Sequence, residues 1–585
     1  MARKDNTDSH GLVNTDVAGT RVPNVDEGTP LLTSDTQKPP RYESFPTAVE
    51  DDQKWCPPPG FWWIETALWA NVFLSGFDGT ITASTYAAIG SDFNAANNAA
   101  WLTTSYLITS TAFQPLYGRF SDMFGRRICF FISTVTFMAG CFGCSVAGSM
   151  WTLVFMRALT GFGGGGLITM ATVVNSDMIP FQKRGMYQAI QNILVGLGAV
   201  LGASLGGAIT ETIGWRWCFL LQVPVSIFAL IVGHVALENP PTLLDTTPEL
   251  MDPKHPFRSA LGRLDLLGAS VLVLGLVAQL MGLTLGGNEF PWGSPVVVAS
   301  LVGSALLLLA FVGVEATTTA IPMIPLRMLH GWQPVAVQLT NVFAGMAAYA
   351  YLFMIPLYFQ AVRGESPSVA GMRLMVPALA TPIGGVIAGT LMSRGHPLRL
   401  NVRLGTLTML AGNLLALSMG MKGQGPWADF FYLVPANLGL GLTNPSVLFS
   451  FVSLFEHQEQ AVATSTVYLI RSMGNIYGVT VTSAIVQNLL LTRLPEVLGT
   501  AGTDEIIEQL GKSLFAVGQL PPPLQAAVRE LYGDALRLAF AASSSFAFLA
   551  FLFSLAHKTR SLQRRCPKEA REEGRVEDGK DGERC

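Results

Sequence analysis

The chain has 585 residues, of which 50% are hydrophobic and only 13% are charged, and its formal net charge is −3. Soluble domains carry about 25% charged residues, so this composition excludes an ordinary soluble domain, and the net charge argues against binding to nucleic acid. A membrane-spanning helix needs about 20 mostly apolar residues, and the chain is long enough for many such helices.

Residues 1–58 are polar and rich in proline, and they lack the apolar core of a signal peptide. We predict a disordered cytoplasmic tail here. Within it, Glu27 stands four positions before the pair Leu31 and Leu32. This pattern resembles the acidic dileucine signal that cargo adaptors read on proteins bound for vacuoles, although a short pattern of this kind also arises by chance. Pro30 keeps the segment extended and therefore accessible to an adaptor.

Fourteen apolar segments follow the tail, and each is predicted to be a helix because lipid offers backbone groups no hydrogen-bond partners. We expect the spans at 62–89, 99–117, 128–148, 152–177, 187–211, 216–237, 264–286, 295–314, 332–360, 369–393, 402–421, 427–454, 462–490 and 535–556. Lys and Arg are concentrated in alternate loops, so the positive-inside rule places both termini in the cytoplasm if the number of spans is even.

These spans divide into two predicted bundles. Six helices form an N-terminal bundle over 59–237, and six more form a C-terminal bundle over 332–556, with a long outer loop at 491–534. Between the bundles, residues 238–331 are predicted to be a linker with an inserted helix pair, and 557–585 a charged cytoplasmic tail. The stretch 118–127 after the second span is similar to 389–396 after the tenth, and such repetition between halves is typical of transporters.

The loop after the second predicted span combines glycines with opposite charges. Its glycines permit a tight turn, and the acid lies among three arginines, which can pair with it or interact with a helix C-terminus. We predict that this cluster latches helices together and releases them during a conformational cycle; an ordinary basic loop is the alternative. The predicted latch consists of Gly118, Arg119, Asp122, Gly125, Arg126 and Arg127.

Four of the charged residues within the predicted spans are candidate functional residues, because a charge at mid-bilayer costs about 2.5–3.5 kcal/mol on insertion scales. Asp78 is expected to line a cavity or to form a hydrogen bond within the bundle. For Arg157, proton coupling and a structural ion pair are both open. Arg471 is a second candidate for the cavity, and Glu65 near the cytoplasmic side is a candidate that could instead snorkel to the interface.

Three motifs carry a resemblance to a known family. The loop 118–127 resembles the loop 2–3 signature of the major facilitator superfamily, and the stretch from Arg157 to Gly165 resembles its fourth-span motif linked to proton coupling. In the fifth span the glycines resemble the antiporter motif, which implies a helix bend, although Ala203 stands where the family usually has proline. These glycines are Gly198, Gly202, Gly206 and Gly207.

The resemblance implies an all-α major facilitator fold with 14 transmembrane helices in two six-helix bundles plus an inserted pair. The span count and the motif that begins at Asp78 resemble the fourteen-span drug:proton antiporters, and 114–117, 214–217 and 459–464 resemble fungal vacuolar basic amino acid transporters and their multidrug-like relatives. The implied mechanism is alternating access.

The expected function is therefore proton-coupled transport of small organic solutes, with basic amino acids or similar cations carried into the vacuole. The alternatives are efflux of a toxin, drug or secondary metabolite at the plasma membrane, and a nutrient receptor that signals without net flux. The sequence contains no phosphate-binding P-loop and no metal-binding His/Cys cluster, so we expect no enzyme activity, metal or cofactor. The expected partners are the solute, protons and a cargo adaptor, and the protein is expected to be a monomer.

Overall fold

The computed structural model describes residues 56–93, 100–237, 264–287, 290–318, 320–365, 369, 373, 375–419, 428–456, 459–498 and 521–558. Glu27, Leu31 and Leu32 of the predicted sorting signal lie outside the described residues, as do nearly all of the two predicted tails. Regular structure in the described part is helical, which confirms the all-α prediction.

A helix lies over each of the fourteen predicted spans. In chain order the segments are α1 (Phe61–Asp92), α2 (Ala100–Phe124), α3 (Arg126–Val146), α4 (Met150–Met178), α5 (Phe181–Thr212), α6 (Arg216–Leu220) with α7 (Gln222–Ala236), α9 (Leu266–Leu285), α10 (Pro295–Thr317), α11 (Trp332–Leu357) with the π-helix η4 (Tyr358–Val362), α13 (Met375–Ser393), α14 (Leu398–Ala416), α15 (Ala428–Val452), α16 (Gln460–Leu498) and α19 (Pro522–Leu555). Eight segments of the described chain are long and apolar enough to cross a membrane, so the full number of crossings stays a prediction.

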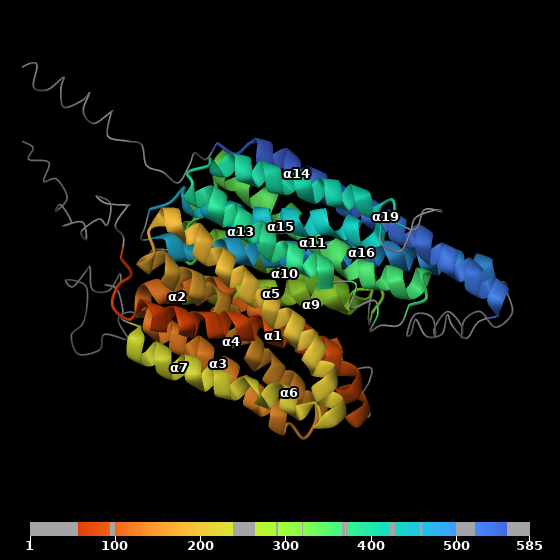
Figure 1. Cartoon of the computed structure of the whole chain (residues 1–585), viewed down its shortest axis with the longest axis horizontal. Helices are drawn as coiled ribbons and strands as arrows, with labels where there is room; N and C mark the ends of the chain where they lie inside the picture. The colour runs from red at the N-terminus through yellow and green to blue at the C-terminus, as the bar shows by residue number, and fades with distance from the viewer. Residues whose placement is uncertain are drawn as a thin grey trace, which may run out of the picture. The chain divides into compact units, whose positions relative to one another are not determined.

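The helices pack in two groups. Helices α1 to α7 pack on one another, with α1 against α5 and α2 and α3 against α4, and appear side by side in red to yellow in Figure 1. Helices α11 to α19 form the second group, with α14 against α15 and α11 against α16 and α19. The two groups meet where α5 packs against α13 and α2 against α16. This pairing brings helices from distant parts of the sequence to one central interface.

The helix pair α9 and α10 packs as a hairpin and contacts helices of both groups. Helix α9 lies against α2 and α16. A buried apolar cluster joins Leu116 of α2, Leu272 of α9 and Leu469 of α16. The pair therefore lies alongside the interface between the two bundles, which is where an insertion between the halves can be accommodated without breaking either bundle.

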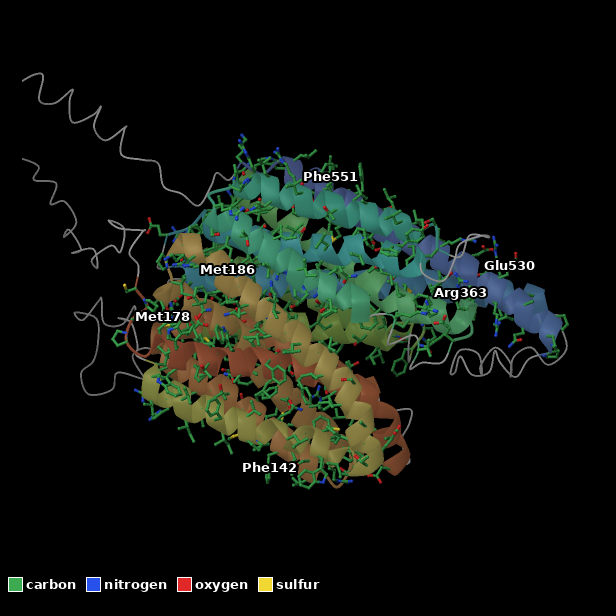
Figure 2. The ribbon with its side chains drawn as sticks, viewed as in Figure 1. Phe142, Met178, Met186, Arg363, Glu530 and Phe551 are labelled. Atoms are coloured by element: carbon green, nitrogen blue, oxygen red, sulfur yellow. The ribbon has the colours of Figure 1, made fainter. Side chains whose placement is uncertain are left out.

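Many apolar side chains point outward. Phe142 of α3 is 52% exposed and Val235 of α7 is 81% exposed, and Figure 2 shows Phe142 on the outer side of its bundle. Large exposed apolar area of this kind is not tolerated on a soluble monomer, but it suits contact with lipid tails. Figure 2 also places Met178 and Met186 toward one end of the helices and Arg363 and Glu530 toward the other.

We call the end with Met178 and Met186 the basic end, because the arginine-containing turns 118–127 and 393–403 also lie there. At this end two glycines at corresponding turns have positive φ values, 92° for Gly125 between α2 and α3 and 78° for Gly395 between α13 and α14. A side chain is disfavoured in this conformation, so the two halves use the same turn chemistry at the positions where the sequence repeats.

The prediction of a loop over the whole of 491–534 is wrong at both ends. Helix α16 continues to Leu498 and α19 begins at Pro522, while 499–520 lie outside the described residues. The helical extensions are stabilised by an apolar cluster in which Leu494 of α16 packs with Val528, Leu531 and Tyr532 of α19. Isolated polar residues in this stretch obscured the apolar stripe that these two extensions share.

Candidate functional site

A buried ion pair lies inside the N-terminal bundle. Arg157 Nη1 of α4 is 2.8 Å from both carboxylate oxygens of Asp78 on α1, and the two side chains are 1% and 0% exposed. Gln222 of α7 donates to Asp78 Oδ1 at 3.4 Å, and Arg157 Nε donates to the Leu102 carbonyl at 3.2 Å. Each charge is therefore compensated by the other and by polar neighbours, as a buried pair requires.

The same guanidinium also lies over aromatic rings. The Cζ atom of Arg157 is 4.6 Å from the ring centre of Tyr106 and 5.7 Å from that of Phe219. Such contacts favour a cation in a desolvated site. Two interpretations of Arg157 were left open. The structure shows the ion pair with Asp78, and a role of Arg157 in proton coupling remains a prediction.

The predicted latch is a network within the N-terminal bundle. Arg126 at the start of α3 bonds Asp122 of α2 at 2.7 Å and Asp177 of α4 at 2.8 Å. Arg127 is placed differently, with Nη2 3.1 Å from Nε2 of His234 on α7. Asp177 at the end of α4 is only 18% exposed, because Arg126 binds it. The network thus ties α2, α3 and α4 together at the basic end.

Gly118 of the same motif lies at the interface between the bundles. A Cβ atom on Gly118 would collide with Ser465 and with the carbonyl of Ala461 on α16. Arg119 is buried nearby, and its Nε has no hydrogen-bond partner among the described residues. The motif therefore combines a charged network inside one bundle with a glycine that permits close approach of the other.

Two glycines of the predicted helix-bend motif permit close packing of α5 against α1. Cβ atoms on Gly198 and Gly202 would collide with backbone carbonyls of Phe73 and Phe77 on α1, and Gly207 faces open space. Gly206 accepts a hydrogen bond from Thr210 at its carbonyl. Helix α5 is a single helix from Phe181 to Thr212, so the motif's effect on bending remains a prediction.

Arg471 belongs to a polar cluster between the two bundles. On the C-terminal side, Arg471 Nε donates to Asn341 Oδ1 at 3.2 Å and Nη2 donates to the Asn444 carbonyl at 3.0 Å. Its Cζ lies 5.4 Å from the ring centre of Tyr468, and the Tyr468 hydroxyl bonds Thr172 of α4 at 2.8 Å across the interface. Arg471 forms no ion pair within the described residues. It is thus a half-buried cation beside the central interface that no acid neutralises.

The polar cluster around Arg471 has more hydrogen-bond donors than the acceptors available to them within the described residues. Gln338 accepts from Asn341 at 3.3 Å, but its own Nε2 is buried and unpartnered. Gln191 of α5 accepts from Thr172 at 3.3 Å, and its Nε2 is likewise unpartnered within the described residues. A site with one guanidinium and two spare amide N–H groups is suited to an acceptor-rich, negatively charged group.

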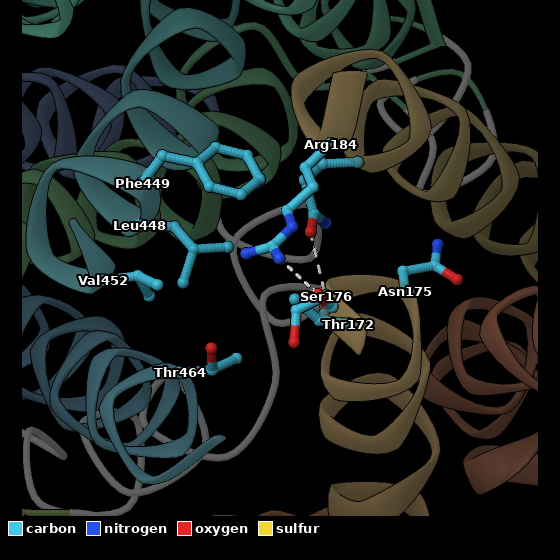
Figure 3. Close-up of a pocket in the computed structure, with 9 residues that line it drawn as sticks. Thr172, Asn175, Ser176, Arg184, Leu448, Phe449, Val452 and Thr464 are labelled. Carbon is cyan, nitrogen blue, oxygen red and sulfur yellow. Dashed lines mark hydrogen bonds between the residues drawn. The ribbon is translucent and has the colours of Figure 1, made fainter. Parts of the chain in front are cut away.

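The basic end of the central interface is closed. Figure 3 shows Arg184 of α5 between Phe449 of α15 and Ser176 of α4. Arg184 donates to the carbonyls of Ser176 and Ile179 and, at 2.7 Å, to Gln460 Oε1 of α16. The cavity that these residues enclose has a volume of about 10 Å³, roughly the room needed by one water molecule. No amino acid fits there, so this conformation is sealed at the basic end.

The Glu65 side chain does not extend to the membrane surface, so the interpretation that it snorkels is wrong. Its side chain is 0% exposed, it lies against the amide of Asn175, and it forms no ion pair among the described residues. Close packing of α1 against α4 and α5 encloses it. The sequence places Glu65 only four residues inside the helix, and it could not show that neighbouring helices cover this position.

Sequence reasoning missed several partners of these charges. Gln222 at the start of α7, Thr172 on α4 and Tyr468 on α16 each contact or adjoin a charged residue. The available signal was a polar side chain within an apolar run, but that signal also marks ordinary packing hydrogen bonds. Within the described residues no group of three or more His, Cys, Asp or Glu side chains could hold a metal ion.

Comparison with known proteins identifies the family. The model of the Major Facilitator Superfamily matches residues 68–479. The chain is 41% identical over 461 residues to vacuolar basic amino acid transporter 2 of Saccharomyces cerevisiae, covering 78% of this chain and 96% of the relative. It is 35% identical over 500 residues to multidrug resistance protein fnx1 of Schizosaccharomyces pombe, covering 85% and 92%.

A solved structure has the same fold. The human organic anion transporter MFSD10 superimposes with a TM-score of 0.56 at 12% identity, covering 85% of this chain and 100% of that one. At that identity the likeness concerns the fold alone. Together with the family match and the two relatives, it confirms the predicted major facilitator fold and a multi-pass membrane transporter rather than an enzyme. The chain belongs to the Major Facilitator Superfamily.

Proposed function

We propose that this transporter carries basic amino acids into the vacuole in exchange for protons. The observation that carries the proposal is Arg471, a cation beside the central interface with no acidic partner within the described residues. The α-carboxylate of an amino acid supplies two acceptor oxygens and a negative charge, which match a guanidinium better than any neutral group does. A cationic drug without a carboxylate would be repelled by the same residue.

The preference for basic side chains and for the vacuole draws support from similarity. The relative that is 41% identical is named as a vacuolar basic amino acid transporter. An acidic vacuolar lumen supplies about 1.36 kcal/mol per proton for each pH unit across the membrane, enough for a tenfold accumulation of solute. We take the basic end to face the cytoplasm, as the positive-inside rule implies, so the contact between Arg184 and Gln460 closes the cytoplasmic side in the proposed cycle.

Flux through the purified protein in proteoliposomes tests this proposal. With an acidic interior, we expect accumulation of arginine and lysine, and little transport of agmatine and cadaverine, which are the same molecules without the carboxylate. Arg471→Gln should raise KM for arginine at least about tenfold, because hydrogen bonds to charged groups contribute about 1.5–3 kcal/mol. Arg537→Gln, which changes an exposed arginine on α19, is the matched control.

A second function is favoured by the relative named for multidrug resistance. If the protein is an efflux pump, cationic drugs and dyes should move without any dependence on a carboxylate, and Arg471→Gln should leave their transport unchanged or increase it. A receptor that signals without net flux would bind arginine but would show no accumulation. The same vesicles and substrate panel therefore separate the three possibilities.

The vacuolar location has its own test in the N-terminal tail. Leu31→Ala combined with Leu32→Ala should move a tagged protein from the vacuolar membrane to the cell surface, because an adaptor that reads the dileucine pair would no longer bind. The control is Val22→Ala with Val25→Ala, two apolar residues of the same tail that have no acid four positions earlier. Wild-type protein at the cell surface would contradict the assignment.

A further inference from the structure

We propose that Glu65, packed beside Asn175, is a proton-binding site distinct from the Asp78–Arg157 pair and carries the proton that drives transport. This inference rests on the proposed exchange of amino acids for protons and assigns the coupled proton to a residue. The supporting observations are the burial of Glu65 and the residues around it in this conformation, which is closed at the basic end.

Glu65 is buried without any compensation of a negative charge. Its side chain is 0% exposed, it forms no ion pair within the described residues, and the neutral amide of Asn175 lies against its carboxyl group. The neighbouring residues Ile64 and Leu68 on α1 are buried in the apolar core of the N-terminal bundle. An ionised carboxylate without a cationic partner is strongly disfavoured in such a place. The carboxyl group is therefore neutral in this conformation, with a proton on one oxygen.

Within the described residues of the helices packed on α1, no cation forms an ion pair with Glu65. On α4, Asn175 lies beside it, and Asp177 is bound to Arg126. On α5, Tyr187 faces it, while Arg184 is held by Ser176, Ile179 and Gln460. On α2, Tyr117 donates to the Phe162 carbonyl, and on α7, His234 lies against Arg127. Glu65 thus differs from Asp78, whose charge Arg157 compensates.

Asn175 connects Glu65 to the closed cavity at the basic end. Its side chain is buried, and its amide lies against the carboxyl group of Glu65. Asn175 lines the cavity with Arg184, and Figure 3 shows its side chain directed away from Leu448 and Val452. Opening of the Arg184–Gln460 contact would admit water beside Asn175. Water would then solvate the carboxylate and accept the proton at the cytoplasmic side.

The same helix links this position to the central cluster. Thr172 lies three residues before Asn175 on α4 and therefore on the same face, and it bonds Tyr468, which adjoins Arg471. A ligand that engages Arg471 can disturb the Tyr468–Thr172 contact between the bundles. The proton on Glu65 and the solute near Arg471 thus both affect the contacts that close the interface between the bundles at the basic end. In each cycle a proton taken up from the lumen leaves Glu65 toward the cytoplasm, and the solute moves in the opposite direction.

Two assays on the full-length protein in proteoliposomes test the role of Glu65. One measures arginine accumulation driven by a pH gradient, and the other measures arginine exchange at equal pH on both sides, which needs no net proton movement. Glu65→Gln removes the titratable group at nearly constant shape. We expect accumulation to fall at least tenfold, exchange to stay within twofold of wild type, and the pH dependence of exchange to flatten. Glu65→Asp should recover part of the accumulation, and Glu530→Gln on the exposed part of α19 should change neither assay.

The outcomes separate the two levels of the proposal. Accumulation at the wild-type level in Glu65→Gln would overturn the role of Glu65 and leave the proposed function standing. Loss of both accumulation and exchange would also overturn it, because it would indicate a structural role. Wild-type vesicles that accumulate no basic amino acid under a pH gradient would instead refute the proposed function. Infrared spectroscopy of the purified protein gives a readout without substrate: a protonated carboxyl band that Glu65→Gln removes is expected at neutral pH, and its persistence would refute a neutral Glu65.

Discussion

Arg157 and Asp78 form an ion pair at 2.8 Å although 79 positions separate them in the sequence, and both side chains are almost completely buried. Removing one partner of a buried pair leaves an uncompensated charge, whereas removing both leaves none. This asymmetry makes the pair testable independently of any substrate.

We expect Asp78→Asn alone and Arg157→Met alone each to destabilise the protein by about 3–5 kcal/mol. The double variant should recover most of the melting temperature lost in the single variants. Thermal unfolding of the detergent-solubilised protein measures this, and the exposed pair Asp534 and Arg537 of α19 is the control. Losses of melting temperature that simply add in the double variant would show that the two side chains do not act as a pair.

The network at the basic end should affect turnover more than binding. Asp122→Asn removes one of the two carboxylates that hold Arg126 and leaves the bond to Asp177. Because hydrogen bonds to charged groups contribute about 1.5–3 kcal/mol, we expect arginine exchange to slow about tenfold with little change in arginine affinity. Asp177→Asn should have a similar effect. An equal loss of affinity and rate would argue against a role in the conformational cycle.

Closure of the basic end can be trapped covalently. A Cβ on Gly185 of α5 would meet Met392 and the backbone of Gly389 on α13, so these two helices approach closely across the bundle interface. In a background without the seven native cysteines, Gly185→Cys with Gly389→Cys should cross-link on oxidation and stop transport, and reduction should restore it. Transport that continues in the fully cross-linked protein would mean that this end does not open.

The pH dependence of stability should report on His557, which follows α19. Burial lowers the pKa of His557 from its ordinary value of 6.5 to about 4, and Thr340 lies 3.0 Å from its Nε2. Because the unfolded state takes up the proton first, stability is retained above pH 6.5 and falls as the pH drops from 6.5 toward 4. The shift corresponds to about 3 kcal/mol.

Melting temperatures between pH 7.5 and pH 5 measure this effect. Wild-type protein should lose stability on acidification, and His557→Gln should lose less of it. His396→Gln changes an exposed histidine at the same end and is the control. An identical pH profile for wild type and His557→Gln would show that this side chain does not contribute.

The local chemistry of this protein is readable along the chain. Long apolar segments determine where helices form, because lipid leaves backbone groups no other partner. Glycine at 125 and 395 marks two of the turns with positive φ, and the acid and arginines of 118–127 are close enough in sequence to form contacts, as Asp122 and Arg126 do. These features need only neighbours within about one helical turn.

The site depends on contacts that no local pattern contains. Arg157 finds Asp78 on another helix, and Thr172 finds Tyr468 across 296 positions and between the two bundles. Snorkelling of Glu65 to the membrane surface was one possibility left open, but the packing of α4 and α5 encloses its side chain. Whether a charged side chain is paired, unpaired or buried is decided by helix packing. The reason is that its neighbours come from segments that are far apart in the sequence.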